Sequence, residues 1–390
     1  MLMKHKLCLV ISGLMASSAS LAAIQVADSR GNGMGFTGVS SANYLAAPFY
    51  NPSLVANHAE SADVRLMLPV IGAGERDDDE VTDASDALFD TYEDFKFEQV
   101  VNGSASQETI DELNAGLNDL AGEKEASVTA TYGFAVAIPG LFSEQGISAN
   151  FFGRRYGEAI NINQVLPQLG AGEQAAELRY DSSNHLTTAF EYYEYGASLA
   201  KNFTYNNHQF SLGVSPKYQR LFTYVETPDF GDLDLITYEN SVHESSLNVD
   251  LGATWYKDQW RVAAVVKDLF KQTIETQLYD YEYELGPQVT LGGSYVSHYF
   301  TAALDIDVTK QKRFSHVDDD TRLISLGVEG NAWDWVQLRA GYQIDLENTF
   351  DNTVTFGLGL SPFNLLNLDL AVAFADEEEG AVSAGLSFTF

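Results

Sequence analysis

Residues 353–360 read Thr-Val-Thr-Phe-Gly-Leu-Gly-Leu, and residues 366–374 read Leu-Asn-Leu-Asp-Leu-Ala-Val-Ala-Phe. Large apolar residues alternate with small or polar ones in both stretches, and residues 336–346 repeat the pattern. Successive side chains of a strand point to opposite faces, so each stretch predicts a strand with one wholly apolar face. The other face is small or polar, which is typical of a membrane barrel with lipid outside and a polar lumen inside.

The last ten residues continue this alternation to the end of the chain. Four of them resemble the C-terminal β-signal of outer-membrane proteins, namely Ser383, Gly385, Phe388 and Phe390. The resemblance implies that this strand is the assembly signal read by the barrel assembly machinery. The alternative is the edge strand of a soluble sandwich, but such a sandwich normally turns a charged face to water, and these strands have none.

Similar segments recur through the chain and predict 14 strands. They lie at 62–71, 126–138, 145–154, 187–203, 208–225, 237–257, 259–270, 285–297, 299–311, 321–332, 335–347, 350–360, 365–375 and 381–390. Short links alternate with long ones, as expected for periplasmic turns and outer loops. We therefore expect an all-β fold, a transmembrane antiparallel β-barrel of about 14 strands over residues 62–390.

The N-terminus reads as a signal peptide, residues 1–22, with cleavage after Ala22. Lys4 and Lys6 precede an apolar stretch from Leu7 to about Met15, followed by small residues. An uncleaved anchor is the alternative, although the apolar stretch is too short to span a bilayer. These features predict a protein of the bacterial outer membrane, with membrane lipid and lipopolysaccharide as its surroundings.

The net charge of −33, from 22 basic and 55 acidic residues, disfavours nucleic-acid binding. The charge is concentrated in the expected outer loop 72–125. Two stretches of that loop, 85–97 and 104–121, have apolar residues at helical spacing. We expect two short amphipathic helices lying over the barrel mouth, or else merely solvated, and another short helix around Ala175.

No catalytic, cofactor or metal motif is recognisable. The seven histidines are scattered without an HExxH pair, and no GxSxG motif occurs. Gly33, Gly35 and Gly38 have GxGxxG spacing, but a dinucleotide loop needs a βαβ unit that this region lacks. We expect a protein that is not an enzyme and has neither a cofactor nor a metal site.

The segment between signal and first strand resembles a known family. Ser29 to Gly35, followed by Tyr44 to Asn51-Pro52, is similar to the start of TraF-like outer-membrane proteins, commonly labelled conjugal transfer proteins. The same motifs resemble FadL-type transporters of hydrophobic compounds. This resemblance implies that residues 23–61 fold into the lumen as a hatch, whose motif residues would be Arg30, Gly33, Gly35, Gly38, Asn51 and Pro52. The lone Cys8 excludes the redox role of the thioredoxin-like protein that shares the TraF name.

Several polar residues fall on the inward face of the predicted strands. They are Lys217, Asp250, Asp305, Asp307, Arg339, Gln343, Asp345 and Asp369. Such charges either hold the hatch in place or line a polar path for solute. Pro216 cannot donate to a strand ladder, so we also expect a local kink or lateral opening there.

Two functions remain open at this point. The first is passive transport of small hydrophobic molecules, which the FadL-type resemblance implies. The second is a non-transporting role in plasmid transfer or surface assembly, with a partner on the acidic outer loops.

Overall fold

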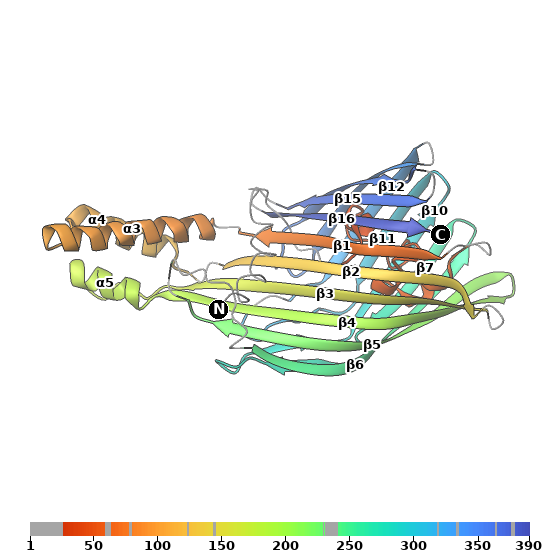
Figure 1. The fold of residues 1–390 in the computed structure, drawn as a ribbon, viewed down its shortest axis with the longest axis horizontal. Helices are drawn as coiled ribbons and strands as arrows, with labels where there is room; N and C mark the ends of the chain where they lie inside the picture. The colour runs from red at the N-terminus through yellow and green to blue at the C-terminus, as the bar shows by residue number, and fades with distance from the viewer. Residues whose placement is uncertain are drawn as a thin grey trace.

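The computed structural model describes residues 26–58, 64–77, 80–122, 125–142, 146–228, 230, 241–317, 320–332, 335–362, 365–375 and 379–390. Within them, fourteen antiparallel strands close into a barrel, in which each strand pairs with the barrel strands before and after it in sequence, and β1 pairs with β16 (Figure 1). The expected signal peptide, residues 1–22, lies outside the described residues. The prediction of a barrel with 14 strands is confirmed.

Most barrel strands lie within about five residues of their predicted bounds, but β3 continues ten residues past its predicted end at 154, so the predicted link 155–186 is shortened to 165–183. They are β1 (Arg65–Arg76), β2 (Glu125–Phe142), β3 (Ile147–Gln164), β4 (Asn184–Tyr205), β5 (His208–Glu226), β6 (Ser241–Lys257), β7 (Trp260–Lys267), β10 (Gln288–Val296), β11 (Phe300–Asp307), β12 (Leu323–Ala332), β13 (Val336–Asp345), β14 (Thr353–Leu360), β15 (Leu366–Phe374) and β16 (Glu379–Thr389). The expected loop 271–284 contains a hairpin of β8 (Gln272–Glu275) and β9 (Glu282–Leu285). Its strands are too short for an alternation pattern to reveal them.

The alternation of side chains follows the predicted faces. Leu338, Phe356 and Phe374 are 60%, 51% and 47% exposed on the outer surface, whereas Arg339 and Thr355 are buried inside. Because the barrel has no free edge, every strand backbone can pair within the sheet, as lipid requires. The closed sheet with an apolar outer face makes this an outer-membrane β-barrel.

The strands differ greatly in length around the barrel. β2 to β6 have 17–22 residues, whereas β11 to β15 have only 8–10. At roughly 3.3 Å per residue, β4 is about 70 Å long and β11 about 26 Å. The apolar band of such barrels is about 25 Å tall. The long strands therefore continue well beyond the membrane on the outer side, as Figure 1 shows.

Three helices form the outer appendage: α3 (Val81–Asn102), α4 (Gln107–Asp119) and α5 (Glu173–Asp181). The carboxylate of Asp77 accepts hydrogen bonds from the first N–H groups of α3, and Ser106 caps α4 through the N–H of Thr109. Leu88, Leu113 and their neighbours pack into a small apolar core between the helices. None of the helices among the described residues is long and apolar enough to cross a membrane.

The position of these helices differs from the expectation. They project from the outer ends of the barrel along its long axis, so the prediction that they lie over the mouth is wrong (Figure 1). Leu88 and Phe95 of α3 pack against the neighbouring helices, whereas Phe97, Val100 and Val101 remain exposed on the appendage, away from the lumen. The predicted helix near Ala175 is confirmed as α5.

Candidate functional site

Residues 26–58, here called the inner segment, lie inside the barrel and are almost entirely buried. They contain the short helices α2 (Ser29–Asn32), η1 (Ala47–Phe49) and η2 (Pro52–Ala56). α2 contacts β14 to β16, and η2 contacts β2 to β6 on the other side. The inner segment therefore spans the lumen from one wall to the other.

The glycines of the predicted hatch motif allow the inner segment to touch the wall through backbone atoms. A Cβ on Gly33 would lie 2.7 Å from the Cα of Gly357. Gly35 has a φ of +64°, and a Cβ on the wall residue Gly341 would lie 1.9 Å from its nitrogen. A Cβ on Gly38 would meet the ring of Tyr50 at 2.3 Å. Larger residues at Gly33 or Gly35 would push the segment off the wall, and one at Gly38 would displace Tyr50 within the segment.

Asn51 and Pro52 hold the other end of the inner segment, at η2, against the wall. The Asn51 side chain accepts from the N–H of Ser53 at the start of η2 and donates to the carbonyl of Val39. A Cβ on Gly252 would lie 1.9 Å from the side-chain oxygen of Asn51. A Cβ on Gly213 would lie 2.3 Å from the carbonyl carbon of Pro52. These contacts are to glycines of β5 and β6, so both halves of the predicted motif rest on glycines of the wall.

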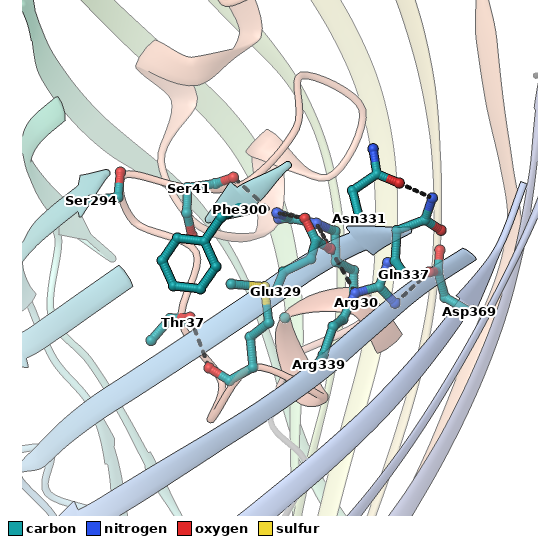
Figure 2. A network of polar contacts seen from close by, with 12 residues as sticks. Arg30, Thr37, Ser41, Ser294, Phe300, Glu329, Asn331, Gln337, Arg339 and Asp369 are labelled. Atoms are coloured by element: carbon teal, nitrogen blue, oxygen red, sulfur yellow. Dashed lines mark hydrogen bonds and ion pairs between the residues drawn. The ribbon is translucent and has the colours of Figure 1, made fainter. Parts of the chain in front are cut away.

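A charged network ties the inner segment to the strands near the periplasmic turns (Figure 2). Arg30 donates through Nε and Nη2 to the two carboxylate oxygens of Glu329, at 2.9 and 2.8 Å. Arg339 donates to Glu329 at 2.7 Å and to Asp369 at 2.6 Å. The four side chains line a polar cavity of about 210 Å³.

A second charged cluster lies in the wall between β3 and β7. The ammonium of Lys217, which is fully buried, lies within 2.9–3.0 Å of Glu194, Asp250 and Asp268. Arg154 pairs with Glu194 at 3.1 Å. Two cations thus face three carboxylates, and this near balance allows the charges to remain buried.

The other inward carboxylates bind backbone groups. Asp305 accepts from the N–H groups of Gly38 and Val39 of the inner segment, at 2.7 and 2.9 Å. Asp307 accepts from the N–H of Leu323 at 3.3 Å and also from the side-chain hydroxyl of Thr290. Asp345, by contrast, accepts from four N–H groups of the outer links at Arg322, Glu347, Thr349 and Phe350. Asp305 and Arg339 favour the hatch-holding interpretation, and Asp345 stabilises a turn.

Outer loops close the lumen from the other side. Tyr283 of β9 stacks on Phe190 of β4, with ring centroids 3.5 Å apart and planes 8° apart. Phe314, from the link between β11 and β12, packs edge-on against Tyr283 at 4.9 Å. Leu221 and Tyr156 complete this apolar cluster.

A cavity of about 170 Å³ lies between the inner segment and the outer loops. Phe36, Val39 and Tyr50 of the inner segment form part of its lining. The barrel wall contributes Tyr156 and other side chains, and the outer loops contribute Tyr283, Arg313 and Phe350. Its lining contains charged, polar, aliphatic and aromatic side chains.

The ladder between β4 and β5 is interrupted at Pro216. Pairing runs as far as Gly196 with Lys217, and resumes in the same register at Leu199 with Val214. Across the interruption the hydroxyls of Ser198 and Ser215 lie 2.5 Å apart. The pairing of β5 with β6 continues past Pro216. The expected local break in the ladder is present, and a lateral opening stays a prediction.

The residues of the expected assembly signal lie on β16 and at the C-terminus. Ser383 accepts a hydrogen bond from Asn32 of the inner segment at 3.1 Å. A Cβ on Gly385 would crowd Val70, and Phe388 and Phe390 form a stacked pair. Recognition by the assembly machinery and contact with lipopolysaccharide stay predictions.

Sequence reasoning missed four members of the two charged networks, namely Arg154, Glu194, Asp268 and Glu329. The alternation of Leu326 and Val328 on the outer face already puts Glu329 inside, so that signal was available. Asp268 follows the last residue of β7 and has no such pattern. Among the described residues, no group of three His, Cys, Asp or Glu side chains is arranged to hold a metal ion.

Residues 48–307 match the family described as "F plasmid transfer operon, TraF, protein". The chain belongs to this TraF family. A search of curated proteins found no match.

Among solved structures, this TraF-family chain is similar to the toluene transporter TbuX of Ralstonia pickettii. The TM-score is 0.55 at 11% identity, over 92% of this chain and 97% of that one. A mutant of the TodX monoaromatic hydrocarbon channel gives a TM-score of 0.54 at 13% identity, over 94% and 99%. TodX of Pseudomonas putida gives 0.50 at 13%, over 95% and 99%. At these identities the similarity shows a shared fold and confirms the expected FadL-type architecture.

Proposed function

We propose that this protein is a passive channel for small hydrophobic molecules across the bacterial outer membrane. The observation that carries the proposal is the cavity between the inner segment and the outer loops, with aromatic rings in its wall. A pocket of this kind shelters an apolar molecule from water on its way through the lipopolysaccharide layer. The solved structures with the same fold are described as toluene transporters and a monoaromatic hydrocarbon channel, which supports the proposal.

The filled lumen argues against a general aqueous pore. The inner segment crosses the barrel and is held by Arg30, Asp305 and Asn51 at separate points of the wall. A hydrophilic solute would have to break contacts of this kind to pass the inner segment. A small apolar molecule needs only a transient route from the cavity, either past the inner segment or through the interruption at Pro216. The alternative role in plasmid transfer has only the family's description in its favour, and we do not propose it.

Uptake of labelled toluene tests the proposal in cells whose own outer-membrane channels for hydrophobic compounds have been deleted. Cells that express the chain should accumulate toluene several-fold faster at first than cells with an empty vector. Folding is verified by the heat-dependent shift of the barrel on a gel. Equal rates with a folded and abundant protein would reject a transport function. A matched measurement with a charged solute of similar size should show no difference between the two strains.

A further inference from the structure

Aromatic side chains on the outer face of β4 to β6 lie at two separate levels. The lower level is one register row near the periplasmic turns, formed by Phe203, Phe210 and Trp255. The upper level begins with Tyr195 and Tyr218, which pair across β4 and β5 and are 51% and 45% exposed. Outer-membrane barrels carry an aromatic girdle at each of the two membrane interfaces. The two levels therefore mark the periplasmic and the outer boundary of the apolar band.

The length of β5 between the two levels places Arg220 at the outer boundary. Arg220 lies ten residues beyond Phe210 on the same face of the strand. At roughly 3.3 Å per residue and a tilt of about 40°, such a stretch rises about 25 Å, which is the height of the apolar band. The Arg220 side chain is exposed. It therefore points outward at the level where lipid hydrocarbon ends and headgroups begin.

A second arginine points outward in the same register row. Arg155 of β3 pairs with Tyr193 of β4, and Tyr193 pairs in turn with Arg220. The guanidinium carbon of Arg155 lies 5.2 Å from the centroid of the Tyr193 ring. That of Arg220 lies 5.0 Å from the centroid of Phe222, and the two rings meet edge to face at 5.7 Å. Two guanidinium groups thus rest on one aromatic platform across the neighbouring strands β3 to β5 (Figure 1).

The charges of this cluster do not cancel. Arg155 donates through Nε to the carboxylate of Glu191, yet 39% of its side chain stays exposed. Arg220 forms no ion pair within the described parts of the chain. The imidazole of His243 lies 5.8 Å from the Phe222 ring and adds an N–H donor at the edge of the cluster. Two cations face one carboxylate here, in a chain whose net charge is −33.

A phosphate group on a lipid fits both halves of this surface. A guanidinium group binds phosphate through two parallel N–H donors, and stacking on a ring fixes the plane of the donors. Lipopolysaccharide carries phosphates on the sugar headgroup of its lipid A, directly above the hydrocarbon of the outer leaflet. Leu247, which is 75% exposed beside Tyr218, offers apolar surface just below the arginines for the acyl chains. A free phosphate ion would gain from the charges alone, whereas the lipid gains from both.

We infer that Arg155 and Arg220 bind a phosphate group of lipid A on the outer face of the barrel. The rings of Tyr193 and Phe222 hold the two guanidinium groups in position for it. The site faces the membrane and not the lumen, so it does not depend on the proposed transport function.

Binding of lipid A to the purified full-length chain tests the inference. The chain in neutral detergent is mixed with bisphosphorylated or with dephosphorylated lipid A, and native mass spectrometry gives the fraction of chains that carry each lipid. We expect the bisphosphorylated form to bind at least about tenfold more tightly, since each arginine near a lipid phosphate contributes about fivefold. Equal binding of the two forms would overturn the inference. Displacement of the lipid by an excess of inorganic phosphate would also overturn it, because the site would then take the free anion.

Arg220→Gln removes one cation without breaking an ion pair among the described residues. It should weaken the binding of bisphosphorylated lipid A about fivefold and leave the dephosphorylated form unchanged. Lys201→Gln is the matched control, since Lys201 lies 5.9 Å from the Phe203 ring two residues further on, but at the periplasmic level. An equal loss in both variants, or none in Arg220→Gln, would contradict the site.

Glu191→Gln separates a specific site from a general loss of stability. It removes the carboxylate beside Arg155 and should tighten the binding of bisphosphorylated lipid A by about twofold to fivefold. Misfolding cannot produce such a gain, and the heat-dependent gel shift verifies the fold of each variant. Unchanged or weaker binding by folded Glu191→Gln protein would refute the part assigned to Arg155.

Discussion

Arg30 and Glu329 lie 299 residues apart in the chain and form a bidentate ion pair inside the barrel (Figure 2). Arg30 belongs to the inner segment and Glu329 to β12, so this pair joins the two parts of the molecule. Arg339 approaches the same carboxylate from the neighbouring strand β13. The Glu329 carboxylate therefore balances part of the charge of two guanidinium groups. Its removal would deprive both Arg30 and Arg339 of this ion pair.

Replacement of this carboxylate should loosen the inner segment. Glu329→Gln keeps the size of the side chain but removes the charge between two buried arginines. Removal of one partner from a buried ion pair typically costs about 3–5 kcal/mol. We expect a lower urea midpoint of unfolding and a higher ion conductance in planar bilayers. Glu284→Gln is the control, since its pair with Lys271 is largely exposed and contributes about 0–1 kcal/mol. Wild-type conductance and stability for Glu329→Gln would contradict the role of this pair.

A methyl group between the inner segment and the wall should be poorly tolerated. In Gly341→Ala the new Cβ would lie 1.9 Å from the nitrogen of Gly35, and backbone must move to relieve it. Overpacking of this kind costs about 1–3 kcal/mol. In Gly330→Ala, on the adjacent strand β12, the Cβ has nothing within 4 Å. Urea unfolding, followed by the gel shift of the barrel, should show a loss for Gly341→Ala only. Equal stability of the two variants would refute the close contact.

Two disulfides can distinguish between the two routes out of the cavity. Ser198 and Ser215 have hydroxyls 2.5 Å apart across the interruption at Pro216, and Ser53 and Thr254 have hydroxyls 2.6 Å apart between inner segment and wall. Both pairs suit replacement by cysteine. We expect the oxidised Ser198→Cys/Ser215→Cys protein to lose toluene uptake and to regain it on reduction. The oxidised Ser53→Cys/Thr254→Cys protein should keep its uptake, because many contacts hold the inner segment whereas only two residue pairs close the interruption. The reverse result would mean that the route passes the inner segment.

Acidification should loosen the outer link between β11 and β12. Burial lowers the pKa of His316 to about 4, and its ring stacks on Tyr281 with centroids 3.6 Å apart. A released histidine has a pKa near 6.5, so the released state binds more protons between pH 6.5 and pH 4. The packing of this link therefore weakens as the pH falls through that window. Hydrogen exchange of residues 308–317 should rise from pH 7 to pH 4.5 after correction for the intrinsic rate. His316→Phe keeps the stacking and should abolish the change; a persistent change would assign it elsewhere.

The strand pattern of the sequence predicted the barrel because lipid imposes a strict rule on alternate residues. Leu338, Phe356 and Phe374 had to be apolar, and the structure places them outside. The rule fails where the wall rises above the membrane, since strands there meet water on both sides. The ion pair of Arg155 with Glu191 lies in that region, and its residues carry no sign of which face they occupy.

The polar contacts of the lumen were only partly predictable. The alternation of strand residues between the two faces placed Lys217, Asp305 and Arg339 inside the barrel. It does not tell which charged side chains contact one another. The pairing of Arg30 with Glu329 depends on how a segment of irregular backbone crosses the barrel, and no periodic pattern describes such a path. The hairpin of β8 and β9 was missed because its strands of four residues are too short to show an alternation.

The unequal lengths of the strands give the barrel a slanted rim. On the side of β2 to β6 the sheet continues roughly 40 Å beyond the level at which an 8-residue strand ends. On the opposite side the mouth is bordered by loops alone. Under the proposed function, a molecule that arrives along the cell surface would meet a high wall from one direction and a low rim from the other, which would make entry from outside directional.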